Sequence, residues 1–230
     1  MIFPLRDSAI RLRFPWVTLG LIGLNVILFG YGRLLPPESY RDWLIANSLI
    51  PAQLFRSGLV HPFRMLLSSM FMHANLMHLT GNMLYLWIFG DNIENELGAF
   101  NFVVFYLLAG LGAALLQVLI DSTSPIPVLG ASGAVSGILG AYLLRYPRAR
   151  IQVLLFFFIY IRRVWIPAVY LLGFWFLIQL SNAMNSLNMA QSGGVAWFAH
   201  IGGFLVGIIL LLAMRPYERK RLWKVLNRES

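Results

Sequence analysis

Long apolar stretches without charged residues recur along this chain, and they restrict its possible folds more than any other feature. A helix needs about 20 consecutive, predominantly apolar residues to cross the hydrocarbon core of a bilayer. Hydrophobic residues make up 59% of the chain and charged residues 12%, whereas soluble domains contain about 45–50% and about 25% of these two classes. The sequence therefore predicts an all-α, polytopic membrane protein and excludes a soluble enzyme.

Six apolar segments are predicted to cross the membrane as a six-transmembrane-helix bundle, which forms one domain over residues 1–230. The run 151–161 is also apolar, but it is too short to span a bilayer and is predicted to be interfacial or re-entrant. Residues 215–230 are predicted to form a basic cytoplasmic tail. The predicted spans are 15–31, 70–90, 100–120, 129–144, 164–183 and 195–214.

The distribution of Lys and Arg predicts the orientation of these spans. With both termini cytoplasmic, 14 of the 18 basic residues lie on the inner side, as the positive-inside rule expects. The net charge of +9 then reflects the membrane flanks, and no nucleic-acid partner is expected. The start of the chain shows no signal-peptide or presequence pattern, which favours a multi-pass protein of a prokaryotic plasma membrane.

Two outer connections are predicted to border the membrane. Residues 34–63 alternate polar with large apolar side chains, so we expect them to lie on the membrane surface, with a solvated loop as the alternative. Residues 184–194 are rich in Asn, Ser and Gly and are predicted to form a mobile cap.

Polar residues inside the predicted spans form three groups. Burial of such residues in lipid costs free energy, so they commonly have a function. Ser132 begins the short fourth span between Gly130 and Gly133, which leaves its hydroxyl open to a substrate backbone. The unpaired N–H groups of a helix N-terminus would face a developing oxyanion there. Ser136 and Gly140 continue a stripe of small residues on this helix. A packing role for Ser132 remains the alternative.

His200 lies in the sixth span on one helix face with Gly203 and Gly207. This pair of glycines suits close contact with the fourth span, which would bring His200 towards Ser132. A packing histidine or a proton relay is the alternative.

His78 and Asn82 are one helical turn apart in the second span, so both could donate hydrogen bonds to one oxyanion. A hydrogen-bonded clamp between helices is the alternative. His73 is predicted at the outer mouth of the site. No metal site is expected, because the spacing of the histidines fits no zinc pattern.

Together these motifs resemble the rhomboid intramembrane serine proteases. The resemblance rests on the runs 130–133, 199–203 and 72–83, with Arg64 and Glu94 in the adjoining loops. It implies a rhomboid-like bundle with a Ser–His dyad, without an acidic third residue and without a cofactor. Such an enzyme cleaves a peptide bond in or near the transmembrane segment of another membrane protein. The expected partners are transmembrane-helix substrates and the lipid bilayer.

By position, the resemblance implies that Ser132 is the nucleophile and His200 the general base. It also implies an oxyanion hole formed by His78, Asn82 and the backbone N–H of Ser132. Many members have an aromatic residue that packs on the histidine where Ser136 stands here, so the orientation of His200 is left open. Several members have Trp where Phe63 stands. The residues expected to support the site are Gly130, Gly133, His73, Ser136 and Gly203.

Two other functions stay open from the sequence. A catalytically inactive relative would bind membrane helices, but such proteins typically lack the serine or the histidine. A small channel or transporter would use the buried histidines as a proton path and would not need glycine beside Ser132.

Overall fold

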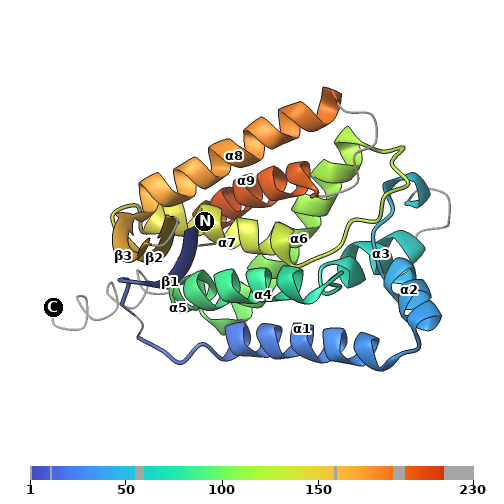
Figure 1. Cartoon of the computed structure of the whole chain (residues 1–230), viewed down its shortest axis with the longest axis horizontal. Helices are drawn as coiled ribbons and strands as arrows, with labels where there is room; N and C mark the ends of the chain where they lie inside the picture. The colour runs from blue at the N-terminus through green and yellow to red at the C-terminus, as the bar shows by residue number, and fades with distance from the viewer. Residues whose placement is uncertain (1, 11, 55–59, 158–159, 189–194, 215–230) are drawn as a thin grey trace, which may run out of the picture.

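The computed structural model describes residues 2–10, 12–54, 60–157, 160–188 and 195–214, most of which are helical (Figure 1). The strands are β1 (Ile2–Asp7), β2 (Arg150–Phe157) and β3 (Tyr160–Pro167). The helical elements are α1 (Trp16–Leu34), α2 (Pro37–Ala46), the 3-10 helix η1 (Pro51–Gln53), α3 (Val60–Ser69), α4 (Leu76–Tyr85), the π-helix η2 (Leu86–Gly90), α5 (Asp91–Leu97), α6 (Ala99–Ile120), α7 (Ser132–Arg145), α8 (Ala168–Asn188) and α9 (Trp197–Ala213).

Two of the described helices, α1 and α6, are long and apolar enough to cross a membrane, and α9 is a shorter apolar helix. The predicted span 70–90 is built differently from a single helix, because α3 ends at Ser69 and α4 begins only at Leu76. Asn75 caps α4 by accepting a hydrogen bond from the backbone N–H of His78 at 2.8 Å. From there the helix continues through η2 into α5.

The predicted outer segments are only partly described. Residues 34–63 include α2 and η1. The helix α8 continues to Asn188, so the first part of the predicted cap 184–194 is helical. The rest of that cap, 189–194, and the predicted tail 215–230 lie outside the described residues.

A three-stranded antiparallel sheet in the order β1-β2-β3 lies at one end of the helices (Figure 1). The prediction of an all-α fold is therefore wrong in this region. The described residues of the run 151–161, predicted to be interfacial or re-entrant, belong to β2 and β3. The first four residues of the predicted span 164–183 also belong to β3. Its β-branched and aromatic residues favour strands. The N-terminal strand β1 supplies a further partner, with Phe3 opposite Leu154.

The short helix α7 lies in the centre of the bundle, in contact with α4, α6, α8 and α9. Every residue from Gly133 to Tyr142 is buried. Large aromatic side chains fill the space around it, among them Phe89, Phe105 and Tyr106, which are fully buried. The residue that begins α7, Ser132, is therefore held on a helix that packing immobilises on every side.

The helices α7 and α9 meet through glycine. A side chain at Gly203 would collide with the backbone carbonyl oxygen of Gly133, and one at Gly207 would collide with that of Gly137. The predicted close contact between these helices is confirmed. On α7 the predicted Gly140 takes part in this contact, because a Cβ there would collide with the carbonyl oxygen of Phe204, and Gly133 and Gly137 take part as well.

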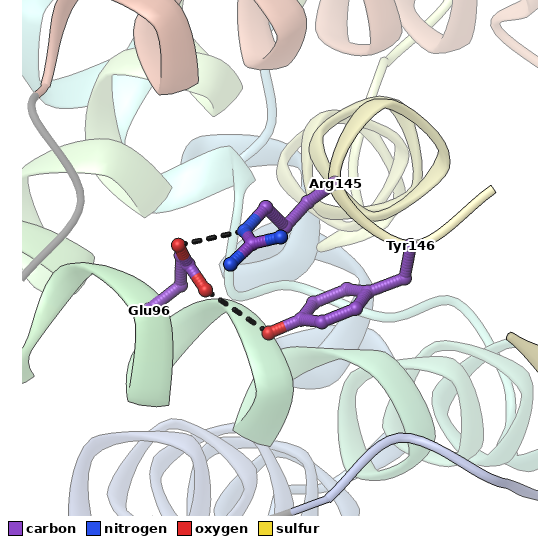
Figure 2. Close-up of polar contacts among 3 residues, drawn as sticks. All are labelled: Glu96, Arg145 and Tyr146. Atoms are coloured by element: carbon purple, nitrogen blue, oxygen red, sulfur yellow. Dashed lines mark hydrogen bonds and ion pairs between the residues drawn. The ribbon is translucent and has the colours of Figure 1, made fainter. Parts of the chain in front are cut away.

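Two buried carboxylates of α5 connect the ends of neighbouring helices. Glu94 accepts a hydrogen bond from the backbone N–H of Thr18 at 2.7 Å, which satisfies a free donor in the first turn of α1. Figure 2 shows Glu96 between Arg145 and Tyr146. The guanidinium Nε of Arg145 lies 2.7 Å from one carboxylate oxygen, and the Tyr146 hydroxyl donates to the other at 3.1 Å. These contacts fix the start of α1 and the end of α7 relative to α5.

Candidate functional site

Ser132 is the first residue of α7, and the loop before it is held in place by backbone contacts. The N–H of Gly130 donates to the carbonyl oxygen of Ser69 at 2.8 Å, which joins this loop to the end of α3. Ala131 is fully buried, and its carbonyl oxygen accepts the first helical hydrogen bond, from Val135, at 2.9 Å. The first N–H groups of a helix have no intrahelical acceptor and lie at the positive end of its dipole. Ser132 therefore stands where backbone donors are available to a negatively charged oxygen.

Gly130 accommodates two polar side chains of α4. Its φ of +122° is a conformation that favours glycine. A Cβ at this position would lie 2.6 Å from Nε2 of His78 and 3.5 Å from Nδ2 of Asn82. Both side chains therefore converge on the backbone that precedes Ser132, as their spacing on one helix face predicts.

His73 does not lie at an exposed mouth, so this part of the prediction is wrong. Its side chain is 2% exposed, and its Nε2 lies 3.0 Å from Nδ2 of Asn82. Its ring packs edge-on against that of His78, with 5.1 Å between the ring centroids. Asn75 caps α4, and the turn that precedes it places His73 beside Asn82 in the second turn of that helix. His73 thus holds the Asn82 amide in one orientation.

His200 lies near the start of α9 and is held by a residue of α8. Its Nδ1 lies 2.8 Å from Oε1 of Gln179, whose side chain is 4% exposed. The rings of Trp175 and Trp197 each lie 6.1 Å from the imidazole, measured between centroids. One residue before His200, the backbone N–H of Ala199 donates to the side chain of Gln117, a buried glutamine on α6.

Reasoning from the sequence missed Gln179. The signal for it is a single amide side chain in the otherwise apolar run 164–180. Its distance of 21 positions from His200 carries no local pattern, so only the packing of α8 against α9 brings the two together.

Ser136 and Gly133 occupy packing positions around the nucleophile candidate. The hydroxyl of Ser136, one turn along α7, donates to the carbonyl oxygen of Ser132 at 2.7 Å, and its residue is 1% exposed. A Cβ at Gly133 would lie 2.6 Å from the Cβ of Ala113 on α6. Both residues therefore need to be small where they stand.

A cavity of about 940 Å³ connects these groups. Ser132 and His200 both line it. Among the described residues, no hydrogen bond joins the side chains of these two residues. Catalytic hydrogen bonds are commonly long in enzymes without a substrate. No three His, Cys, Asp or Glu side chains among the described residues lie together as a metal site would require. The other predicted site residues that line the cavity are His78, Asn82, Gly130, Gly133 and Ser136.

Comparison with known proteins gives the same family as the motifs. The family model described as "Rhomboid domain" matches residues 60–217. Rhomboid protein 1, mitochondrial, of Saccharomyces cerevisiae is 31% identical over 194 residues, which are 82% of this chain and 50% of the yeast protein. RHOMBOID-like protein 6, mitochondrial, of Arabidopsis thaliana is 35% identical over 153 residues, 66% of this chain and 44% of the plant protein.

The human Presenilin-associated rhomboid-like protein, mitochondrial, is 29% identical over 219 residues, 91% of this chain and 50% of the human protein. The chain thus spans about half the length of the curated relatives it matches. All three relatives are mitochondrial by name, and this finding overturns the predicted prokaryotic plasma membrane. That prediction relied on the start of the chain. The start carries no information on location here, because the sequence spans only about half the length of its relatives.

Proposed function

The chain belongs to the rhomboid family, and from this premise we propose that it hydrolyses a peptide bond in or near the transmembrane segment of other membrane proteins. The rhomboid family consists generally of intramembrane serine proteases. The observation that carries the proposal is the common cavity that Ser132 and His200 line, at the place where α7 and α9 meet through glycine.

Ser132 is the nucleophile of this proposed reaction and His200 its general base. The imidazole takes the proton of the Ser132 hydroxyl as the oxygen attacks the scissile carbonyl, and it later delivers that proton to the leaving amine. Water then hydrolyses the acyl-enzyme. The position of Ser132 at the start of a buried helix supports this role, because packing holds the nucleophile in one place.

The proposed oxyanion hole consists of the backbone N–H of Ser132 and the side chains of His78 and Asn82. Their convergence on Gly130, the residue two before the nucleophile, supports this assignment. One N–H of the Asn82 amide is engaged by His73, and the amide has a second N–H that is available to the oxyanion. Gly130, Gly133, Ser136 and Gly203 support the site through the close contacts that their small size permits.

The substrate is a membrane protein whose helix reaches the cavity from the lipid. An extended backbone is needed at the scissile bond, so a helix that unwinds easily is favoured. Six spans are proposed, formed by α1, α4 with η2, α6, α7, α8 and α9, with both termini on the side that carries most Lys and Arg residues. The names of the relatives favour a mitochondrial membrane as the location.

Fluorophosphonate labelling of the purified protein tests this proposal. An active protease reacts at a single serine, Ser132, and cleaves a model transmembrane substrate. An inactive relative or a channel would show neither reaction. Absence of labelling in a folded preparation would overturn the proposed activity.

A further inference from the structure

A buried amide contacts the proposed general base from behind. The side chain of Gln179 is 4% exposed inside the apolar helix α8, and its Oε1 lies 2.8 Å from Nδ1 of His200. A polar side chain in such a place needs hydrogen-bond partners, because an unpaired amide is costly in an apolar environment.

The second contact of Gln179 determines which way its amide is oriented. Its Nε2 donates to the backbone carbonyl oxygen of Trp175, one turn earlier on α8, at 3.3 Å. The amide nitrogen is therefore directed along α8, and the amide oxygen faces His200. A carbonyl oxygen only accepts hydrogen bonds, so the imidazole must donate from Nδ1.

This donation selects one of the two neutral forms of the imidazole. With the proton on Nδ1, the other ring nitrogen, Nε2, carries the lone pair that a general base needs. We propose that Gln179 is a positioning residue that holds His200 in this tautomer and orientation for its reaction with Ser132. The inference rests on the proposed protease function and adds to it the partner that fixes the base.

The comparison with Ser–His–Asp enzymes shows what an uncharged partner changes. There, an aspartate accepts from Nδ1, fixes the tautomer and stabilises the imidazolium. Gln179 accepts from the same nitrogen without a charge, so it orients the ring and stabilises the imidazolium less. The rings of Trp175 and Trp197 lie beside the imidazole, each with 6.1 Å between centroids, whereas the hydroxyl of Ser136 is engaged with the carbonyl oxygen of Ser132.

The first test replaces Gln179 by two side chains of similar length, one without a hydrogen-bond acceptor and one with a charged acceptor. Gln179→Met keeps the volume and removes the acceptor, and we expect kcat to fall about 10- to 100-fold with little change in KM, less than the roughly 10⁴-fold loss when an Asp is replaced in a triad. Gln179→Glu keeps an acceptor and adds a charge, so activity is retained. A carboxylate stabilises the imidazolium, so the acid limb of the pH–rate profile moves to higher pH in this variant. The other titratable residues lining the cavity, His78, Asp121 and Tyr85, are unchanged in both variants.

Gln117→Met is the matched control for loss of a buried amide. Its Oε1 accepts from the backbone N–H of Ala199 at 3.2 Å, one residue from His200, and among the described residues it has no hydrogen bond to the imidazole. We expect this variant to lower Tm, like Gln179→Met, without changing the tautomer of His200 or moving the acid limb.

A direct readout of the tautomer does not require catalysis. In protein labelled with ¹⁵N-histidine, two-bond ¹H–¹⁵N spectra should show the proton of neutral His200 on Nδ1, with the signals assigned by their loss in His200→Ala. In Gln179→Met the proton should move wholly or partly to Nε2. A wild-type His200 protonated on Nε2 would overturn the inference whether or not Gln179→Met folds.

The outcomes separate this inference from the proposed function. A wild-type protein that neither labels nor cleaves overturns the protease assignment, and the spectra still decide the contact of Gln179. A wild-type protein that cleaves, together with a Gln179→Met variant of equal kcat and unchanged tautomer, overturns the positioning role alone.

Discussion

A side chain at Gly203 would collide with the backbone carbonyl oxygen of Gly133, so α9 and α7 touch backbone to backbone. Without a hydrophobic driving force inside lipid, helices associate through such close packing. Ser132 directly precedes Gly133 in the chain, and His200 lies three residues before Gly203 on the same helix, α9. The spacing between the two candidate dyad residues therefore depends on the packing of α7 against α9, to which the contact of Gly207 with Gly137 also contributes.

We expect Gly203→Val to lower Tm and cleavage together. A branched side chain forces the helices apart, and overpacking of this kind destabilises by about 1–3 kcal/mol. Gly173→Val is the matched control, because a Cβ at Gly173 on α8 meets no atom within 4 Å. Thermal unfolding and cleavage of a model substrate measure both effects, and a stable, active Gly203→Val variant would contradict the contact.

Ser132→Ala and His200→Ala should each abolish cleavage while the protein stays folded. Loss of either member of a nucleophile–base pair lowers kcat by about 10⁴-fold or more. Ser136→Ala is the control for a neighbouring serine, since its hydroxyl is engaged with the Ser132 carbonyl oxygen. It should retain fluorophosphonate labelling at Ser132. Substantial proteolysis by purified Ser132→Ala would contradict the dyad.

Asn82→Ala should lower turnover by about 10²- to 10³-fold with little effect on substrate binding, if the Asn82 amide donates to the oxyanion. Labelling of Ser132 should slow and yet persist, because nucleophile and base remain. A purely structural clamp between Asn82 and His73 predicts a lower Tm and a parallel fall in labelling and binding. Tm, labelling rate and turnover measured on one preparation distinguish the two roles, and unchanged turnover would remove Asn82 from the site.

Gly130→Ala should inactivate the protein more than it destabilises it. A non-glycine residue at positive φ costs about 1–3 kcal/mol in stability. The added Cβ would also lie 2.6 Å from Nε2 of His78 and would therefore displace that imidazole. Gly20→Ala on α1, where a Cβ meets nothing within 4 Å, is the control and should leave kcat unchanged. If Gly130→Ala cleaved at the wild-type rate, His78 and Gly130 would not belong to one site.

Glu96→Gln should lower stability without removing activity. The carboxylate is 2% exposed and joins Arg145 to Tyr146 (Figure 2), and a hydrogen bond to a charged group contributes about 1.5–3 kcal/mol. Because the Arg145 side chain is 45% exposed, we expect the lower end of that range. Glu38→Gln, an exposed acid of α2, is the control and should leave Tm unchanged. Equal Tm values for the two variants would show that the Glu96 contacts contribute nothing.

The sequence alone determined the protein class, the family and the candidate residues of the site. Transmembrane class follows from the length of uncharged runs such as 100–120, and the family follows from short motifs around Ser132, His200 and His78. Both signals are local, because they depend on residue types at fixed, short spacings. The glycine face of the sixth span was predictable for the same reason: a period of 3.6 residues places Gly203 and Gly207 together.

The tertiary structure decided every contact between residues that are far apart in the chain. The pairing of β1 with β2 joins residues about 150 positions apart, and no local sequence pattern predicts it. The contacts of Gln179 with His200 and of His73 with Asn82 depend on how each helix or turn is rotated against its neighbour. In a membrane, hydropathy carries no such information, because a lipid-facing helix surface and a protein-facing one are equally apolar. The sequence could therefore name the proposed base, and only the packing of α8 on α9 could identify the amide that holds it.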